Sequence, residues 1–420
     1  MTLRFFTIQK SYIIFIILFS FFISSTIFII TGKVLNNLIF LILFLFLSCN
    51  IVLKKNISTK VLYYFGGYLL YLGMSIFVAQ IYGISITNSI AEFVYYLKPA
   101  LFFFAGYYYL NERRFGILVA VLLGFMCIGT IYAYLNASSL VDLTSIRMSA
   151  MGYGNDPVSR RLHMWVVNPI YFSLFGKFWV TDGGFILRNP TLLLSPLESG
   201  FVAAFISGYY MIKSSLVSKK YYFLYSISVA LLISTFVRTA WIYFFVTFIT
   251  FHILSIKSLL NKLIILILGV AVIAVFTLAN LEQIKFLLFL ENSASTHNEN
   301  ISDVFQHIFN NVFGTGLGSS GWQGDVSSKH YIYSEGSLFT SFVELGIQFI
   351  LVYIFMFFAI LKKSTLYLFP LYLAFLVGSL FLPISFFTPF VILFFSMMGM
   401  IFNKDFNNKQ YNLYLKKTSF

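Results

Sequence analysis

Charged residues are scarce in this chain. Only 10% of its 420 residues are Asp, Glu, Lys or Arg, whereas a soluble globular domain carries about a quarter. Cysteine is rarer still, and its two copies, Cys49 and Cys127, both fall inside apolar runs. That placement excludes a disulfide framework and a thiolate metal site. The composition therefore argues against an ordinary soluble domain and against a cysteine-stapled secreted one.

Apolar residues take the place of the missing charges. They make up 59% of the chain, and Phe alone accounts for 53 positions. They come in runs of roughly 17–25 residues separated by polar segments, the length that crosses a bilayer as an α-helix. The sequence thus predicts an all-α polytopic membrane protein with about 12 transmembrane helices. The predicted spans are residues 11–31, 35–53, 61–81, 90–110, 115–135, 195–212, 221–237, 239–256, 263–281, 337–361, 365–382 and 386–402.

Basic residues are distributed unevenly between the predicted loops. With the N-terminus cytoplasmic and the sides alternating, both termini are cytoplasmic and the short outward loops hold only Lys33 and Arg238. This is the positive-inside bias of a plasma-membrane protein, so the net charge of +14 does not indicate nucleic acid as a partner. The cytoplasmic segments hold 18 of the 28 basic residues: Arg4, Lys10, Lys54, Lys55, Lys60, Arg113, Arg114, Lys213, Lys219, Lys220, Lys257, Lys262, Lys362, Lys363, Lys404, Lys409, Lys416 and Lys417.

Two connections are long, 136–194 and 282–336, and both face outward by the same alternation. Loops of this length are usually functional when they are ordered. Each carries apolar residues at helical spacing, which predicts an amphipathic helix on the membrane surface, although packing within the protein would explain the same spacing. The residues are His163, Trp165, Phe172, Phe175, Phe178 and Trp179, then Val304, Phe305, Ile308, Phe309 and Val312. No internal repeat is present, and residues 1–420 are predicted to form one integral domain.

Three alternate glycines follow the second stripe, in the run FGTGLG at 313–318. A nucleotide-binding fingerprint of this kind requires a preceding strand and a following helix in a βαβ unit, and neither is predicted here. The run is expected to form a tight turn. Its N–H groups could either serve the protein alone or contact a ligand.

Arg188 and Arg238 are each predicted to lie where a span meets the outer face. Arginine is costly in an apolar setting, and its planar guanidinium binds phosphate oxygens in pairs, so the two residues predict an anion site. Contact with lipid head groups would also explain Arg188. Arg160 and Arg161, in the first long loop, fit either the same anion or an anionic lipid.

Lys98 is the basic residue predicted deepest in a span, roughly 12 Å from its outer end. A buried charge is costly unless it is paired. Lys98 is therefore expected to neutralise Glu344 or Glu198, or else to reach the bound anion.

Three stretches of the chain resemble a known family. They are Arg188 followed by Pro196 in RNPTLLLSPLESG, the run STFVRTAW at 234–241, and FGTGLGSS with SEGSLFTSFVELG at 313–320 and 334–346. In this order and on this side of the membrane, they are similar to the bacterial O-antigen polymerase and ligase superfamily of polytopic glycosyltransferases. Together with the predicted spans, the resemblance covers most of the chain.

The resemblance implies an enzyme of the bacterial plasma (inner) membrane with its active site facing the periplasm. Its donor would be an undecaprenyl-diphosphate-linked oligosaccharide, with Arg188 and Arg238 as the main diphosphate ligands. Glu335 or His330 would accept the proton of the attacking sugar hydroxyl. Diphosphate is a good leaving group and no acidic pair or His/Asp cluster faces outward, so neither a metal nor another cofactor is expected. A chain-length regulator protein is a possible partner.

Family ligases tend to carry a histidine about nine residues before the glutamate that precedes the glycine. Counting back from Glu344 leads to Glu335, and the nearest histidine is His330. This departure favours a polymerase over a ligase that transfers finished glycan to lipid A core. A flippase for lipid-linked oligosaccharide is the third alternative. The uneven halves, the two large outer loops and the few mid-membrane charges argue against it.

Overall fold

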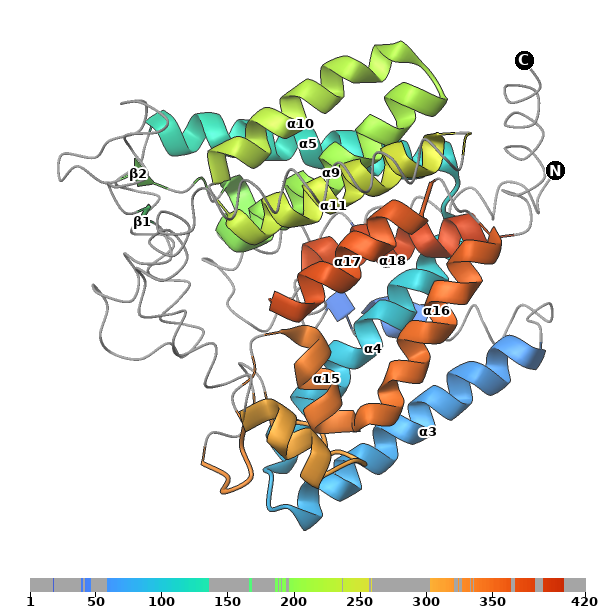
Figure 1. Ribbon diagram of the computed structural model, residues 1–420, viewed down its shortest axis with the longest axis vertical. Helices are drawn as coiled ribbons and strands as arrows, with labels where there is room; N and C mark the ends of the chain where they lie inside the picture. The colour runs from blue at the N-terminus through green and yellow to red at the C-terminus, as the bar shows by residue number, and fades with distance from the viewer. Residues whose placement is uncertain are drawn as a thin grey trace. The chain divides into compact units, whose positions relative to one another are not determined.

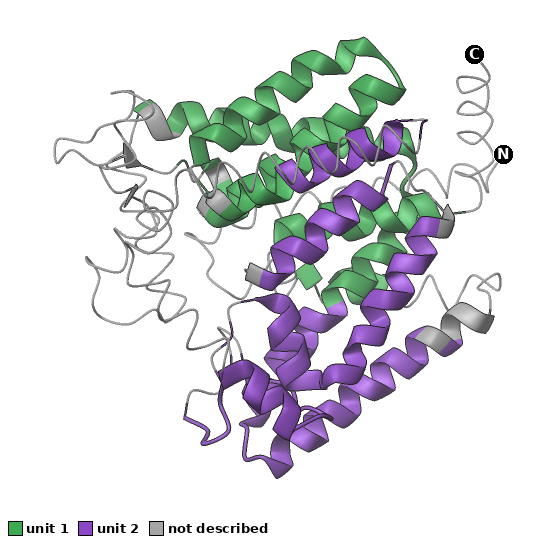
Figure 2. Cartoon of the chain, in the orientation of Figure 1, with its two compact units in different colours: residues 1–57, 98–244, 387–420 green, residues 58–97, 245–386 purple. Residues whose placement is uncertain are grey.

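The computed structural model describes residues 18, 39–40, 42–46, 59–135, 166–167, 186–187, 189, 191–193, 196–235, 237–256, 258, 303–320, 324, 327–332, 334, 336–363, 367–381 and 388–403. These residues are mostly helical, as the predicted all-α class requires. The chain divides into two compact units (Figure 2), and each is described by itself. Unit 1 is 1–57, 98–244 and 387–420, and unit 2 is 58–97 and 245–386.

Unit 1 is built on a helical hairpin. Helices α9 (Pro196–Leu216) and α10 (Tyr222–Thr235) are joined by the 3-10 turn η3 (Lys219–Tyr221) and pack closely along their lengths (Figure 1). Helices α5 (Glu112–Leu135) and α18 (Thr388–Phe402) pack against α9. The centre of the unit is formed by four fully buried rings in edge-to-face contact: Phe201, Phe205, Tyr243 and Phe390.

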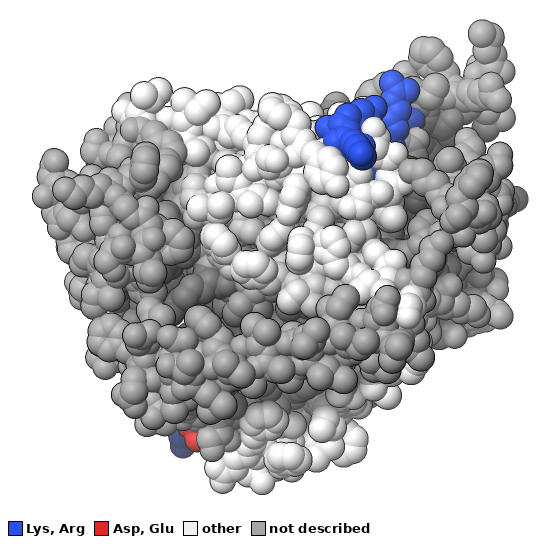
Figure 3. Space-filling view, turned by 45° about the horizontal axis from the view of Figure 1, so that its top comes forward, with Lys and Arg blue, Asp and Glu red and all other residues white. Residues whose placement is uncertain are grey.

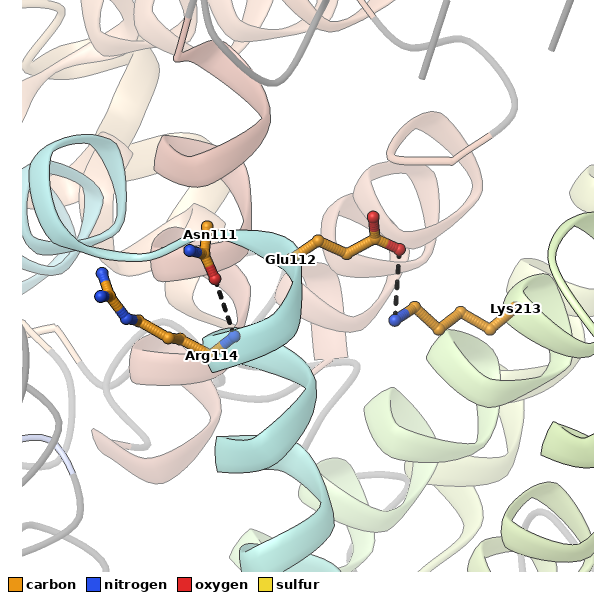
Figure 4. A network of polar contacts seen from close by, with 4 residues as sticks. All are labelled: Asn111, Glu112, Arg114 and Lys213. Carbon is orange, nitrogen blue, oxygen red and sulfur yellow. Dashed lines mark hydrogen bonds and ion pairs between the residues drawn. The ribbon is translucent and has the colours of Figure 1, made fainter. Parts of the chain in front are cut away.

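The first turn of α5 shows how its sequence starts the helix. Oδ1 of Asn111 accepts the main-chain N–H of Arg114 at 2.9 Å, the capping role that asparagine favours. Glu112 suits the positive end of the helix dipole, and its carboxylate pairs with Nζ of the buried Lys213 of α9 at 3.3 Å (Figure 4). The same ammonium lies over two aromatic rings, those of Tyr209 and Tyr221.

The helix ends in unit 1 fall into two groups. Thr130 near the end of α5, Ser234 at the end of α10 and Asn189 just before α9 are joined by hydrogen bonds. The opposite ends of α5 and α9 meet at the pair of Glu112 and Lys213. Helices that alternate in direction produce this grouping, and it agrees with the alternation of sides that the basic residues predict.

Helix α18 approaches the second half of α4 (Ile86–Tyr109) closely within unit 1. A Cβ atom added to Gly106 would collide with the main chain of Ser396, and one added to Gly399 would collide with the carbonyl of Phe103. Small residues at such crossings let two backbones approach, as is common between membrane helices.

Unit 2 is held together by a cluster of buried apolar side chains. Its helices are α3 (Thr59–Ile81), α15 (Ser337–Leu345), α16 (Ile350–Lys363) and α17 (Phe369–Phe381), with the 3-10 turn η4 (Ile347–Phe349) between α15 and α16. A further short helix covers 303–310 and is drawn in gold beside α15 in Figure 1. The cluster joins α3, α4, α15, η4 and the glycine turn through Leu72, Tyr96, Leu317, Leu345 and Phe349.

The single span predicted over 337–361 is wrong in one respect. It is two helices, α15 and α16, separated at Gly346, whose φ of +84° favours glycine. The predicted division at Arg238 is confirmed, because α10 ends at Thr235 and α11 (Arg238–Ser255) begins at Arg238.

The first long loop contains the two strands that are found among the described residues. Strands β1 (Val166–Val167) and β2 (Ile186–Leu187) pair antiparallel. Val166 and Val167 lie inside the stripe predicted to be helical over 163–179, so that prediction is wrong at these two residues. The remainder of the stripe, the span 263–281, and most of the spans 11–31 and 35–53 lie outside the described residues.

The described surface is rich in exposed apolar side chains at helical spacing. One stripe on α3 is Leu70, Met74, Phe77 and Ile81, and one on α5 is Ile117, Val121, Ile128, Ile131 and Leu135. Soluble monomers rarely expose continuous apolar patches of this extent. In Figure 3 most of the visible Lys and Arg atoms gather at one place, a smaller charged group lies at the lower edge, and the rest of the described surface in this view is almost uncharged.

Among the described residues, one helical stretch is long and apolar enough to cross a membrane, Glu112–Tyr132. Shorter apolar helices are Phe65–Ile81, Thr239–Ser255, Ile347–Leu361, Phe369–Leu380 and Thr388–Phe402. The total of 12 crossings and their sidedness stay predictions.

Candidate functional site

The glycine run in unit 2 is a turn that uses its own N–H groups. Each main-chain N–H from Gly314 to Ser319 donates to an acceptor within the protein: the carbonyls of Asn311, Val343, Glu344, Ser75 and Gly316, and a carboxylate oxygen of Glu344. No N–H group in that stretch is left to hold an anion. The structural alternative for this run is therefore confirmed.

All three alternate glycines have a positive φ, +82° at Gly314, +90° at Gly316 and +88° at Gly318, a region that other residues rarely adopt. Gly314 and Gly316 also lack space for a Cβ atom, and one at Gly314 would collide with the carbonyl of Glu344. A Cβ atom at Gly316 would collide with the main chain of Ala79 in α3. The turn is therefore packed directly against α3, which fixes the chain that follows it.

Glu344, near the C-terminal end of α15, anchors this turn. Its side chain is fully buried, and Oε1 accepts the N–H of Gly318 at 2.8 Å. Its Oε2 atom has no hydrogen-bond partner among the described residues. The carboxylate of Glu92 in α4, also buried, is an electrostatic neighbour. Glu344 thus has a local structural task, which the sequence did not predict.

A series of hydroxyl groups ties the chain after His330 to the turn. The N–H of Ile332 donates to the carbonyl of Ser319 at 3.0 Å, and Oγ of Ser320 donates to the carbonyl of Ile332 at 2.8 Å. Oγ of Ser334 lies 2.7 Å from the hydroxyls of Ser320 and Thr340. These contacts hold Ser334, the residue directly before the candidate base Glu335, which itself lies outside the described residues.

His330 is exposed and lies in a small polar cluster. Its ring makes an edge-to-face contact with Tyr82 at 5.1 Å between centroids. The hydroxyl of Tyr82 donates to Oδ1 of Asn311 at 3.3 Å. His307 is close enough to His330 to interact electrostatically, and its Nε2 lies 3.3 Å from the hydroxyl of Thr315. Burial first, and then His330, lower the pKa of His307. An exposed imidazole with ordered neighbours can accept a proton from a bound hydroxyl.

A second polar cluster lies in unit 1 around Asn189. Its N–H donates to the carbonyl of Ser234 at 3.1 Å, and Nδ2 donates to the hydroxyls of Thr130 at 2.7 Å and Ser234 at 2.9 Å. Oδ1 accepts the N–H of Thr191 at 3.0 Å, and Thr191 Oγ1 lies 2.9 Å from Ser199 Oγ in α9. Nearly every hydrogen-bonding atom of this buried side chain is satisfied, which makes the position rigid.

This cluster involves both arginine-bearing segments. Asn189 directly follows Arg188 in the chain, and Ser234, in the last turn of α10, lies four positions before Arg238. Arg238 is the first residue of α11, the helix start that the sequence predicts. The hydrogen bond between Asn189 and Ser234 therefore brings together segments that lie 45 residues apart.

The other predicted site residues have separate outcomes. Nζ of Lys98 donates to Oγ1 of Thr388 at 3.3 Å within unit 1, so its predicted ion pair and anion contact stay predictions. Arg160, Arg161, Arg188 and Glu335, together with the side chain of Arg238, lie outside what the structure describes. Within the described part of the chain, no group of three or more His, Cys, Asp or Glu residues is placed to hold a metal ion.

Sequence reasoning missed Asn189, Tyr82, His307 and the serine at 334. Asn189 was visible as the residue after Arg188 in RNP, where Asn before Pro is typical of a turn. Tyr82 and His307 carry no such signal, because their meeting depends on the fold. Comparisons with protein-family models, with curated proteins and with solved structures find no match for this chain.

Proposed function

We propose that this chain is a membrane glycosyltransferase that polymerises oligosaccharide repeat units carried on undecaprenyl diphosphate, on the periplasmic face of the bacterial inner membrane. The proposed activity is that of the O-antigen polymerases, which three stretches of the sequence resemble. The growing glycan leaves its diphosphate carrier and is joined to the non-reducing end of the next carrier-linked unit. Arg188 and Arg238 bind the diphosphate, and Glu335 or His330 accepts the proton of the attacking hydroxyl.

The membrane part of the proposal is supported by the surface of the helices. Exposed apolar stripes on α3 and α5 suit contact with lipid tails and would be costly in water. The two groups of helix ends in unit 1 agree with the alternating sides that the positive-inside rule predicts.

The hydrogen bond from Asn189 N to Ser234 O, at 3.1 Å, is the observation that carries the assignment. The proposal requires guanidinium groups from two distant segments to bind one anion, and this contact joins the residue after Arg188 to the helix end before Arg238. A diphosphate offers several oxygens, and two arginines can bind it with parallel hydrogen bonds. Binding that strengthens as negative charge grows on the leaving group accelerates the transfer.

The proposed chemistry needs little beyond these groups. The attacking hydroxyl loses its proton to a carboxylate or imidazole, a role worth ~10²–10⁴ in rate. The bond between the anomeric carbon and the diphosphate oxygen breaks as the new glycosidic bond forms, and the diphosphate leaves on its lipid. In unit 2 the hydroxyl groups of Ser320, Ser334 and Thr340 would hold the chain around Glu335 in place.

The proposal is tested in cells that lack the native copy. Arg238→Ala and Glu335→Gln are expected to abolish ladders of long surface glycan, and Arg238→Lys to restore only part, because lysine keeps the charge but not the paired hydrogen bonds. Arg113→Ala is the matched control, since Arg113 is exposed at the first turn of α5 on the predicted cytoplasmic side. Normal ladders with both test variants would remove the assignment.

A purified preparation separates the polymerase from its alternatives. Protein in liposomes is given carrier-linked repeat units and no other acceptor. A polymerase makes products of two or more units. Unchanged repeat units would count against a polymerase. In a second reaction with added lipid A core, transfer of glycan to that core would support a ligase. Movement of the units to the other leaflet without transfer would support a flippase.

A further inference from the structure

The short helix over 303–310 in unit 2 has three distinct faces. Val304 and Ile308, four residues apart, are 2% and 4% exposed. Phe305 and Phe309, also four apart, point elsewhere, and Phe309 is 71% exposed. Asp303, Gln306 and Asn310 form a third, exposed polar face. A helix that packs only on its own protein needs one apolar face, so the second apolar face is unexplained by the fold.

The buried face is fully accounted for by contacts inside unit 2. Val304 and Ile308 pack on Val343 of α15, with Ile332, Phe339 and Phe342 around them. The Phe305 ring touches only the margin of this cluster, edge-on to Phe339 at 5.5 Å. The helix is therefore held firmly on one side, and its orientation is set by the protein.

The exposed apolar face continues beyond the helix. Val312 is 45% exposed and Phe313 is 82% exposed. The carbonyl of Val312 accepts the N–H of Ile347 at 3.0 Å, and the carbonyl of Phe313 accepts Nε2 of Gln348 at 3.3 Å. The face is therefore joined directly to the start of η4 and α16.

Helix α16 carries the same kind of surface onward. From Ile347 it exposes a band of large apolar side chains: Ile350, Leu351, Ile354, Phe355 and Phe358. Helix α16 has 14 residues and carries no charge before the lysine pair that ends it. A band of this composition that runs the length of a helix suits lipid tails. By the predicted topology, Phe313 lies at the outer end of this band, just before α16 begins.

We propose that the 303–310 helix lies in the head-group layer of the outer leaflet, with the face of Phe305, Phe309 and Phe313 inserted among lipid chains. The polar face of Asp303, Gln306 and Asn310 contacts water. Lipid is the occupant because the face is continuous with α16, whose own exposed band is apolar throughout. Phenylalanine beside a polar face is typical of helices that bind a membrane surface.

This placement has a consequence for the candidate site. Helix 303–310 carries His307 and leads directly into the glycine turn, and the turn holds the chain around Ile332 and Ser334. An inserted aromatic face fixes the height of these residues above the bilayer. A diphosphate on a polyprenyl tail is restricted to the same layer. The inference requires only that α16 is in a bilayer, and it stands whether or not the protein transfers glycans.

Single spin labels test the three faces directly. In full-length protein with Cys49 and Cys127 replaced by serine, cysteine is introduced in turn at Phe309, Phe313, Asn310 and Ile308, and each variant is labelled in lipid nanodiscs. Oxygen, which concentrates in lipid, and a water-soluble nickel chelate are the two relaxation agents. Labels at 309 and 313 are expected to favour oxygen over nickel by several-fold, and the label at 310 to favour nickel. The label at 308 is the buried control and is expected to respond weakly to both.

Three results would overturn the proposal. Strong nickel accessibility at 309 and 313 would place this face in water. Weak response to both agents, with dipolar broadening between labels, would assign the face to a second copy of the chain. Weak response without broadening would assign it to another part of the protein. None of these outcomes depends on glycan synthesis, so failure here is distinguishable from failure of the proposed function.

Discussion

Asn189 and Ser234 are joined by two hydrogen bonds, one between main-chain atoms at 3.1 Å and one from Nδ2 of Asn189 to Oγ of Ser234 at 2.9 Å. The amide also donates to Thr130 and accepts from Thr191. One small side chain thus links the ends of α5 and α10 with the chain that leads into α9. Its neighbours in sequence include the arginine on which the proposed diphosphate site depends.

Replacing Asn189 is expected to loosen this junction. In Asn189→Ala the hydroxyls of Thr130 and Ser234 lose a donor and the N–H of Thr191 loses its acceptor, at a cost of about 1–3 kcal/mol. The thermal midpoint of the purified protein falls, and glycan ladders shorten because the Arg188 segment is no longer held. Ser226→Ala on the exposed side of α10 is the control and changes neither. A variant at 189 with wild-type midpoint and ladders would contradict the structural role.

We expect alanine to have opposite effects on folding at two glycines, Gly316 in the turn and Gly73 in α3. Gly316→Ala introduces a Cβ atom where φ is +90° and where the main chain of Ala79 is in the way. Strain of about 1–2 kcal/mol for the backbone is added to the displacement of α3, and the protein is expected to lose most of its folded yield.

Gly73→Ala is the matched control for that variant. Gly73 is in α3, the helix that the turn contacts, and nothing lies within 4 Å of an added Cβ atom. Alanine there is expected to be neutral or to raise stability by about 0.5–1 kcal/mol. Fluorescence-detected size exclusion of both variants compares their folded yields. Equal yields would show that the turn can move away from α3.

Most of the described helices could be predicted from the sequence, because the length of an apolar run is enough to predict a helix. The helices α3, α4, α5, α9, α10, α11, α17 and α18 lie in predicted apolar segments with ends that differ by a few residues. Separation at Arg238 followed from one charge in an apolar run. The break at Gly346 was missed because a glycine inside a hydrophobic run is ordinarily tolerated, and its positive φ is imposed by the neighbouring turn.

The polar clusters were much harder to predict. Tyr82, His307 and His330 come from three separate segments, and only tertiary packing brings them together. The hydrogen bond from the N–H of Gly318 to the carboxylate of Glu344 was not predicted. A main-chain N–H in an unusual turn leaves no trace in the pattern of side chains. Residue spacing predicts helix faces well, but it does not predict which loops meet.

The fold is expected to tolerate a residue at position 344 that lacks the negative charge of Glu344 but keeps a side-chain oxygen. It is not expected to tolerate a residue without that oxygen. Glu344→Gln keeps an acceptor for Gly318 N–H and removes electrostatic repulsion from Glu92, so its thermal midpoint is expected to equal or exceed that of the wild type. Glu344→Leu leaves a buried N–H unsatisfied, which costs about 1–3 kcal/mol. If the glutamine variant were as unstable as the leucine variant, the negative charge itself would be required at this position.

Because the pKa of His307 is lowered in the folded protein, we expect the free energy of unfolding to decrease as the pH falls. Burial first and the electrostatic influence of His330 second lower the pKa of His307, so the folded protein binds this proton less readily than the unfolded chain, whose histidine has a pKa of about 6.5. The contribution of His307 to stability is therefore fully present above pH ~6.5 and is lost as the pH falls from there toward the lower folded pKa.

Three proteins test this dependence: the wild type, His307→Gln and His330→Gln. Asp303, on the same helix, is left unchanged in all three, and His330 is left unchanged in the His307→Gln variant. His307→Gln keeps a hydrogen-bonding group for Thr315 and removes the titration, so its thermal midpoint is expected to fall less than that of the wild type between pH 7.5 and 5.5. His330→Gln removes the electrostatic influence of His330 on His307 and is expected to give an intermediate slope. Three parallel curves would show that His307 titrates alike in the folded and unfolded chain.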